Sequence, residues 1–231
     1  MPRKPPGSGK HQPRGLSILH EDRDLIVVSK ASGLLTVGTA RGAERGPERT
    51  AEAALTDYVR KGNPKSRKRV FVVHRLDRET SGALVFAKTE AAKSTLQKHW
   101  KDVEKIYLAA VEGIPDPRED TISTYLVENA AMRVYSTSVP AEGKWSETRY
   151  RVVKTAGNRA LLEVALLTGR KHQIRVHLSE RGWPVVGDRK YGAKSRDRER
   201  LALHSHRLSF DHPTHGRRVS VTAPLPQSFR W

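Results

Sequence analysis

The residues best suited to chemistry in this sequence are an aspartate and the two arginines that flank it. Asp77 lies between Arg75 and Arg78 in a polar stretch. Two guanidinium charges this close would keep the carboxylate ionised, which suits a nucleophile better than a general acid. An isolated aspartate between arginines is equally typical of a salt-bridged surface loop. The residues on both sides of Asp77 are therefore needed to decide between a catalytic carboxylate and a salt-bridged surface loop.

Two apolar runs enclose this stretch and would hold it in place. Residues 70–73 read V-F-V-V and residues 83–86 read A-L-V-F. Short runs of β-branched and aromatic residues on both sides of a polar segment predict two buried strands joined by a turn. Asp77 is therefore expected on a turn between strands rather than on a helix.

The segment around Asp77 also matches a known signature. Residues 74–82, H-R-L-D-R-E-T-S-G, resemble without a gap the signature of the RluA-type pseudouridine synthases. The likeness continues in residues 17–34, with Ala31 where the family usually has proline, and runs to about Pro213. It implies a pseudouridine synthase fold, an enzyme that isomerises uridine in RNA, and no cofactor. The family often carries an N-terminal S4-type RNA-binding module, for which the segment before residue 17 is too short.

Two more residues take catalytic roles from the same resemblance. Tyr107 lies in K-I-Y-L-A-A-V-E-G, similar to the family's active-site tyrosine segment, where a phenol could stack on an extruded pyrimidine and relay a proton. Arg175 lies in L-T-G-R-K-H-Q-I-R-V-H-L, similar to the third motif, which implies an ion pair with the catalytic Asp77. Judged alone, the tyrosine would be a core residue and the arginine a surface cation.

Contacts to RNA are expected from residues near these motifs. His74 and Arg75 would shape the Asp77 loop, and Arg75 would fill the space left by a flipped base. Lys171 stands where the family usually has threonine or serine. Residues 60–69 carry six basic side chains and no acid, which indicates either a solvated face or a phosphate-binding strip. The predicted RNA-binding residues are His74, Arg75, Arg78, Arg170, Lys171, Arg67, Lys68 and Arg69.

The composition favours a nucleic-acid partner. The 231 residues include 43 Lys and Arg against 25 Asp and Glu, a formal charge of +18, and such an excess indicates a polyanion. No apolar run approaches the roughly 20 residues of a membrane span. The absence of cysteine excludes disulfides, thiolate zinc sites and thiol nucleophiles. The N-terminus has no secretory signal, so the cytoplasm is the expected location. A strongly charged single domain also favours a monomer.

The remaining patterns predict an α+β domain. They indicate a mixed, mostly antiparallel sheet with few flanking helices and a central active-site cleft. Residues 1–14 are proline-rich and basic and are expected to form a disordered arm, while residues 15–231 would form one catalytic domain. Residues 38–49 are expected to be a mobile loop beside the cleft. Strands are predicted over 16–20, 25–30, 105–112, 121–127, 132–138, 147–154 and 159–167, with helices capped by Thr50 and Thr89.

Three other features of the sequence could suggest a metal site, a nucleotide site or a different catalytic carboxylate. His172 and His177 are five residues apart, so they do not share a helix face as a zinc pair would, and we expect no metal. The G-S-G-K of residues 7–10 lacks the spacing of a phosphate loop. Asp188 is a rival carboxylate, but its Gly-Asp-Arg setting is typical of a turn cap.

Two other functions stay open at this point. A non-catalytic RNA-binding protein could keep the same fold, although an intact set of Asp77, Tyr107 and Arg175 counts against it. A glycoside hydrolase normally needs two carboxylates beside the scissile bond, and we find one strong candidate. The sequence leaves open whether ribosomal or transfer RNA is modified, and whether Asp77 attacks C1′ or removes a 2′ proton.

Overall fold

The computed structural model describes residues 13–38, 49–195, 200–226 and 229. Within it the chain divides into two compact units. The first comprises Met1–Val103 with Arg207–Pro224, and the second comprises Glu104–His206 with Leu225–Trp231. The predicted basic arm lies almost entirely outside the described residues, as does most of the predicted loop over 38–49.

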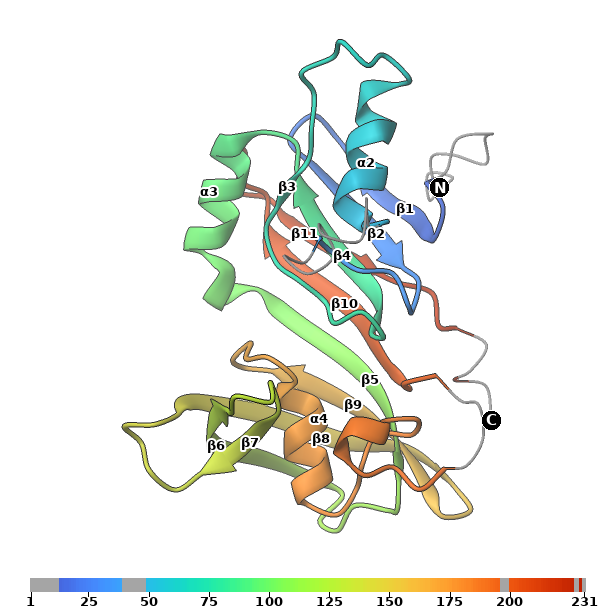
Figure 1. The fold of residues 1–231 in the computed structure, drawn as a ribbon, viewed down its shortest axis with the longest axis vertical. Coiled ribbons are helices and arrows are strands. Elements are labelled where there is room, and N and C mark those ends of the chain that lie inside the picture. The colour runs from blue at the N-terminus through green and yellow to red at the C-terminus, as the bar shows by residue number, and fades with distance from the viewer. Residues whose placement is uncertain (1–12, 39–48, 196–199, 227–228, 230–231) are drawn as a thin grey trace. The chain divides into compact units, whose positions relative to one another are not determined.

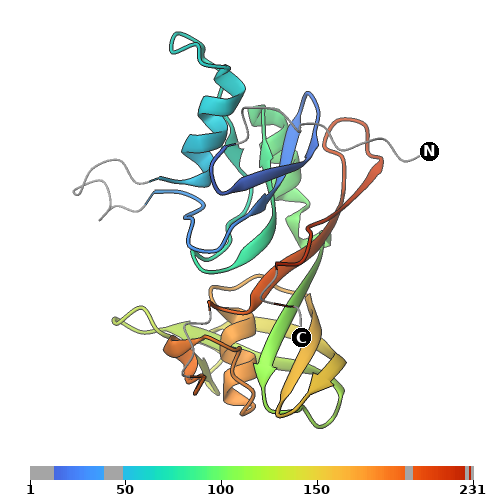
Figure 2. The ribbon, with the colours of Figure 1, turned by 90° about the vertical axis from the view of Figure 1, so that its right-hand side faces the viewer.

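The first unit is built on antiparallel strands. β2 pairs with β1 on one side and with β4 on the other, β3 also pairs with β4, and β10 and β11 form the hairpin visible in Figure 2. The register places Lys30 opposite Gly82 and Leu25 opposite Ala87. The strands are β1 (Leu16–Glu21), β2 (Leu25–Lys30), β3 (Phe71–Val72), β4 (Ser81–Ala87) and β11 (Arg218–Thr222), together with the part of β10 (Leu203–Asp211) from Arg207 onward.

Two helices of this unit begin at the predicted caps. α2 (Ala51–Arg60) starts after Thr50, whose hydroxyl accepts a hydrogen bond from the Ala53 backbone N–H at 3.1 Å. α3 (Glu90–Lys98) starts after Thr89 in the same way, with Ala92 as donor. In both helices the threonine side chain satisfies a backbone N–H of the first turn, which is the usual arrangement of a threonine N-cap. α3 ends at Lys98, and the chain then tightens into the 3-10 turn η1 (Trp100–Asp102).

The core of the first unit explains why β4 is so apolar. All seven residues of β4 are buried, since the strand pairs with β2 and contacts α3 (Figure 1). Burial on both sides of a strand removes the alternation of polar and apolar residues. Its apolar side chains join those of the neighbouring strands and of α3 in one cluster that includes Leu25, Val27, Val85, Leu96, Leu208 and Phe210.

The second unit contains a further set of antiparallel strands and one helix. The strand order is β5-β9-β8-β6-β7, with antiparallel pairing at each step. α4 (Gln173–Glu180) contacts β7 and β8 (Figure 1). The strands are β5 (Glu104–Glu112), β6 (Glu119–Glu128), β7 (Val134–Thr137), β8 (Lys144–Ala156) and β9 (Arg159–Leu166), and a 3-10 turn, η2 (Arg189–Tyr191), follows α4.

These elements confirm the predicted α+β class with a mainly antiparallel sheet. Several strand boundaries differ from the predicted ones by one to three residues. The run over 70–73 forms a strand only at Phe71–Val72, and β8 begins at Lys144, three residues before the expected start. β10 and β11 were not predicted. Among the described residues, no helix is both long enough and apolar enough to cross a membrane.

Candidate functional site

Asp77 lies on the connection between β3 and β4, as predicted. Its side chain is partly exposed, whereas the neighbouring Leu76 is 6% exposed. The buried Thr36 hydroxyl donates to the Leu76 carbonyl at 2.9 Å and accepts from the Leu76 N–H at 3.2 Å. The Asp77 carbonyl accepts from the Thr80 N–H at 3.1 Å. The backbone at Asp77 is thus fixed on both sides, and the residue stays partly exposed.

A buried lysine holds the other half of this loop. Lys30, at the end of β2, is 1% exposed. Its ammonium donates to the carbonyls of Ala31 at 3.1 Å, Leu34 at 2.7 Å and Arg78 at 3.0 Å, which uses all three of its donors. The Arg78 carbonyl also accepts from the Gly33 N–H at 2.8 Å. Lys30 therefore ties residues 30–34 to the Asp77 loop.

The charge of Lys30 matters for the loop as well as its hydrogen bonds. Burial lowers the pKa of Lys30 from 10.5 to about 8, and the negative charges of Glu79 and Asp77 oppose that shift. At neutral pH the ammonium is still protonated in most molecules. The buried Lys30 cation thus attracts the Asp77 carboxylate. Sequence analysis missed Lys30, although its spacing from Ile26 and Val28 in an apolar strand places it on the same face as these two.

His74 and the two loop arginines have different surroundings. The His74 ring stacks on Trp100, with centroids 4.4 Å apart, and its Nε2 accepts from the Val85 N–H at 3.2 Å. His74 thus shapes the loop from its inner side. Arg78 Nε donates to the Gly33 carbonyl at 3.1 Å and lies 3.9 Å from Glu79. Arg75 and Arg78 are exposed, so both can present charge to a ligand.

Tyr107 and Arg175 belong to the second unit. Tyr107 lies in β5 and is 8% exposed, paired in register with Val164 of β9. Arg175 lies in α4, where it is 9% exposed. Asp77 belongs to the first unit. Tyr107 is thus held by a strand, Arg175 by a helix and Asp77 by a hydrogen-bonded loop. The ion pair between Asp77 and Arg175 stays a prediction.

Arg175 forms a two-point ion pair with Asp188. Its Nε donates to Asp188 Oδ2 at 2.6 Å and its Nη2 to Asp188 Oδ1 at 2.8 Å. The side chains are 11% and 1% exposed. Asp188 also caps η2, accepting from the Tyr191 N–H at 3.2 Å. The predicted turn cap is confirmed, and the same carboxylate additionally orients the guanidinium of Arg175.

Tyr191 completes this cluster. Its ring lies against Arg175, whose Cζ is 5.0 Å from the ring centroid. The Tyr191 hydroxyl accepts from the Val134 N–H at 3.2 Å and lies 2.8 Å from His172 Nδ1. A cation over an aromatic face and a two-point carboxylate contact together leave the guanidinium little freedom. His172 therefore contributes to the packing around Arg175.

His177 is similarly engaged in a polar network. Its Nδ1 lies 2.9 Å from the Thr148 hydroxyl and its Nε2 3.0 Å from the Thr124 hydroxyl. Burial, together with the nearby charge of Arg181, lowers the pKa of His177 to about 4. His177 is thus neutral at physiological pH. It joins α4 to β6 and β8 through hydrogen bonds.

The predicted RNA-binding cations differ in how they are engaged. Lys171 forms an ion pair with Glu128, and Arg170 Nε donates to the Trp145 carbonyl at 3.2 Å. The guanidinium of Arg69 lies 4.8 Å from the Phe71 ring centroid. Arg67 and Lys68 are exposed. RNA contact at Lys171 would therefore compete with Glu128, whereas Arg67 and Lys68 present their charges to solvent.

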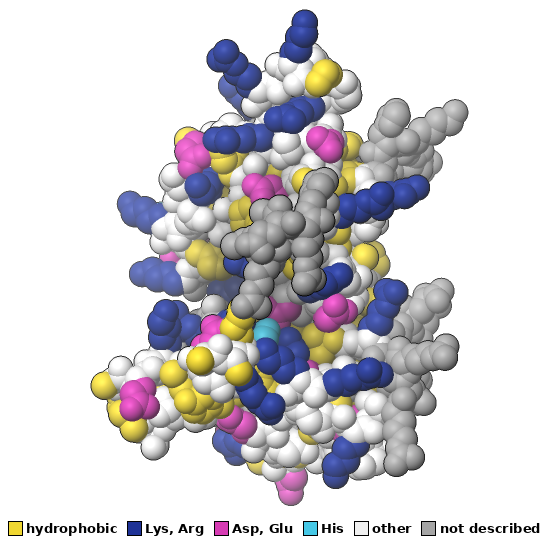
Figure 3. Space-filling model, viewed as in Figure 1, with side chains coloured by type: hydrophobic (Ala, Val, Ile, Leu, Met, Phe, Trp, Pro, Cys, Tyr) yellow, Lys and Arg dark blue, Asp and Glu magenta, His cyan; other side chains and the backbone are white. Residues whose placement is uncertain are grey.

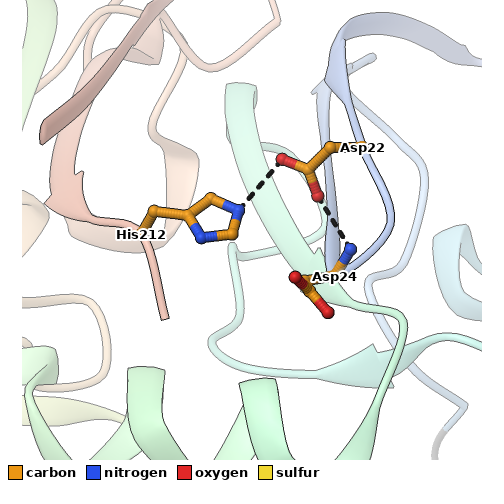
Figure 4. Close-up of side chains that lie close together, drawn as sticks. All are labelled: Asp22, Asp24 and His212. Atoms are coloured by element: carbon orange, nitrogen blue, oxygen red, sulfur yellow. Dashed lines mark hydrogen bonds and ion pairs between the residues drawn. The ribbon is translucent and has the colours of Figure 1, made fainter. Parts of the chain in front are cut away.

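Two aspartates and a histidine of the first unit lie close enough to hold a metal ion. Ligand atoms of Asp22, Asp24 and His212 lie within 4.8 Å of one another (Figure 4). Hydrogen bonds account for the arrangement. Asp22 Oδ2 accepts from Nε2 of His20 at 2.8 Å and of His212 at 3.1 Å, and Asp22 Oδ1 accepts from the Asp24 and Leu25 N–H groups. Asp22 thus joins the β1–β2 turn to the β10–β11 hairpin.

This arrangement predicts a stability difference that depends on pH. Burial would raise the pKa of Asp22, but hydrogen bonds from His20, Leu25, Asp24 and His212 lower it from 3.8 to about 2. A lowered carboxyl pKa stabilises the fold above pH 3.8, and the contribution is lost as the pH falls towards 2. Because the side chain is 30% exposed, we expect Asp22→Asn to cost about 1 kcal/mol at pH 5. Urea unfolding midpoints at pH 5 and pH 2.5 test this, and an equal gap at both would contradict it.

The comparisons with known proteins place the chain in a family. The model of the RNA pseudouridylate synthase family matches residues 24–180, which is more than half of the sequence. The matched range includes Asp77, Tyr107 and Arg175. The chain therefore belongs to the RNA pseudouridine synthases, which are isomerases that act on RNA, and the RluA-type resemblance is confirmed.

Individual relatives agree with this assignment. An uncharacterised RNA pseudouridine synthase of Synechocystis is 36% identical over 221 residues, covering 93% of this chain and 67% of the relative. The ribosomal large subunit pseudouridine synthase D of Neisseria meningitidis is 36% identical over 233 residues, covering 93% and 59%. The solved human RNA pseudouridylate synthase domain containing 1 superposes with a TM-score of 0.72 at 30% identity, covering 94% of this chain and 86% of that one.

Proposed function

We propose that this protein converts specific uridines of structured ribosomal or transfer RNA into pseudouridine, with Asp77 as the catalytic carboxylate. The reaction breaks the N-glycosidic bond, rotates the freed base and joins its C5 to C1′ of the same sugar. Substrate and product have the same atoms, so no oxidant, reductant or cofactor is required. The observation that carries this proposal is a partly exposed carboxylate on a loop fixed by the buried Thr36 and Lys30.

The proposed roles follow from the chemistry of each side chain. Asp77 either attacks C1′ or removes the 2′ proton, and both routes need an ionised carboxylate. Arg175 would hold Asp77 ionised and oriented, which requires a guanidinium with little freedom of its own. Tyr107 would stack on the flipped base and help to move a proton. Extruding the uridine costs roughly a few kcal/mol, which backbone contacts by exposed cations such as Arg75 would offset.

A direct test measures pseudouridine in defined RNA. Purified protein is incubated with unmodified transcripts of ribosomal and transfer RNA, and pseudouridines are mapped by chemical labelling and primer extension. We expect one or a few discrete uridines in one of the two RNA classes to be converted, without added metal or cofactor. Conversion of no uridine in either class would overturn the proposal. The RNA class that is converted identifies the substrate.

Replacing Tyr107 by phenylalanine separates its two proposed roles. Phenylalanine keeps the stacking ring but has no hydroxyl, so a role in proton transfer predicts a fall in turnover of roughly 10²-fold or more with little change in RNA binding. Tyr150→Phe is the matched control, because Tyr150 is a buried tyrosine of the same unit whose hydroxyl donates to the Pro117 carbonyl. Single-turnover rates measure both. Unchanged kinetics in Tyr107→Phe would restrict Tyr107 to stacking.

A further inference from the structure

A groove in the first unit lies at the opposite end of β4 from Asp77. It has a volume of about 1290 Å³ and is bounded by the β1–β2 turn, the second half of α2 and the residues after β4. Ser81, beside the Asp77 loop, and Ala87, beside the groove residue Lys88, are six residues apart on β4, which corresponds to about 20 Å along a strand. The groove is therefore distinct from the Asp77 loop.

Basic residues outnumber acidic ones in this groove. Its lining includes Arg23, Lys61, Lys68, Arg69 and Lys88. Figure 3 shows Lys and Arg side chains gathered around the end of the unit that carries α2 and the loop after it. Arg23, Lys61 and Lys68 are exposed. The groove thus presents several cations that are open to a ligand.

The acidic residues of the groove only partly offset this charge. Glu21 accepts from Lys88 Nζ at 2.9 Å and from the Tyr58 hydroxyl at 3.0 Å. Lys88 also donates to the Asp22 carbonyl. Because Glu21 and Lys88 neutralise each other, Asp57 is the acid left against Arg23, Lys61, Lys68 and Arg69. The groove therefore carries a net positive charge.

Size and charge both favour a polyanion as the occupant. Sites for small molecules typically have volumes of about 300–1,000 Å³. This groove is larger than that range, and five of the thirteen residues that line it are Lys or Arg. The twelve residues before Pro13 contain Arg3, Lys4 and Lys10 and no acid, so the chain's own N-terminal segment does not complement the groove. A phosphate backbone does.

We infer that this groove binds the phosphate backbone of RNA at a distance of several nucleotides from the uridine held at Asp77. The inference rests on the proposed function for the identity of the polymer. Contacts of this kind position an RNA without reading its sequence. The protein would thereby recognise the shape of the RNA outside the stem that contains the target. That contact would help to determine which uridine is flipped into the site.

The test reverses three exposed charges and measures binding without turnover. The test variant is Arg23→Glu, Lys61→Glu and Lys68→Glu, and the probe is bulk transfer RNA titrated at several salt concentrations. Each phosphate contact contributes a little under one unit to the slope of log K against log salt. We expect the slope to fall by about 2 to 3 and binding at moderate salt to weaken by roughly 10-fold or more.

A second triple variant controls for net charge. Lys98→Glu, Lys101→Glu and Arg217→Glu changes the charge of the same unit equally at exposed residues that do not line the groove. Circular dichroism and thermal melting confirm that both variants fold. The inference is supported if the groove variant alone loses slope. Equal loss in both variants, or none in the groove variant, overturns it, and in the latter case an acidic protein is the better partner.

The outcome is independent of catalysis. Binding to bulk transfer RNA needs no conversion of uridine. The binding test can therefore support the groove inference even if no pseudouridine is found by mapping. Conversely, full pseudouridine formation by the wild-type protein with an unchanged salt slope in the groove variant would retain the proposed function and remove the groove from RNA binding.

Discussion

Replacing Asp77 by asparagine is expected to reduce pseudouridine formation by roughly 10³-fold or more. The amide has nearly the same shape as the carboxylate but has no negative charge, so it can neither attack C1′ nor remove a 2′ proton. The bonds that hold the loop run through Thr36, Lys30 and the Asp77 backbone carbonyl. The loop should therefore keep its conformation, and RNA affinity should change little.

The same loop provides a matched control for Asp77→Asn. Glu79 is an exposed carboxylate two residues away, within reach of Arg78 and Ser32. Glu79→Gln removes one negative charge from the loop just as Asp77→Asn does, but should keep activity within a few-fold. Single-turnover rates on one RNA, with melting temperatures of all three proteins, measure the difference. Normal pseudouridine formation by Asp77→Asn would show that another residue performs the chemistry.

How much of this loop the sequence could predict depends on how local each signal is. The turn at Asp77 was predicted because its evidence is contiguous: two apolar runs with a polar segment between them. The Thr50 and Thr89 caps were predicted for the same reason. Lys30 was missed because its partner, the Arg78 carbonyl, is 48 residues away. A lysine at the end of a strand gives no sign of which distant loop its ammonium will reach.

β10 shows a second limit of sequence analysis. Its residues read L-H-S-H-R-L-S-F-D, in which histidines and serines hide the apolar alternation expected of a strand. His204 and Ser205 are nevertheless buried. His212, directly after this strand, lies beside Asp22 and Asp24. That cluster forms through the β10–β11 hairpin, whose position next to the β1–β2 turn is a tertiary feature.

The ion pair between Arg175 and Asp188 gives the largest expected effect on stability. Asp188 is almost fully buried and binds two guanidinium nitrogens of Arg175 at 2.6 and 2.8 Å. Asp188→Ala would leave a buried cation without this carboxylate, which typically costs about 3–5 kcal/mol. It would also free the guanidinium to rotate. We therefore expect a lower unfolding midpoint in urea together with slower pseudouridine formation.

An exposed ion pair of the same unit is the control. Arg151 and Glu163 lie 3.0 Å apart with side chains 55% and 35% exposed, and an exposed pair contributes about 0–1 kcal/mol. Glu163→Gln should therefore shift the urea midpoint only slightly and leave turnover unchanged. A midpoint shift in Asp188→Ala no larger than in Glu163→Gln would show that the buried pair contributes little.

A double substitution distinguishes loss of the pair from loss of one partner. Replacing a buried ion pair by apolar residues of similar size is often neutral or stabilising, because both charges are removed from the interior together. Arg175→Met with Asp188→Leu should therefore be more stable than Asp188→Leu alone, with a coupling energy of about 1–3 kcal/mol in the double-mutant cycle that the single variant Arg175→Met completes. The double variant should still be inactive, since the guanidinium proposed to orient Asp77 is gone. Recovery of stability without recovery of pseudouridine formation is thus the result that separates the structural role of Asp188 from the proposed role of Arg175 in orienting Asp77.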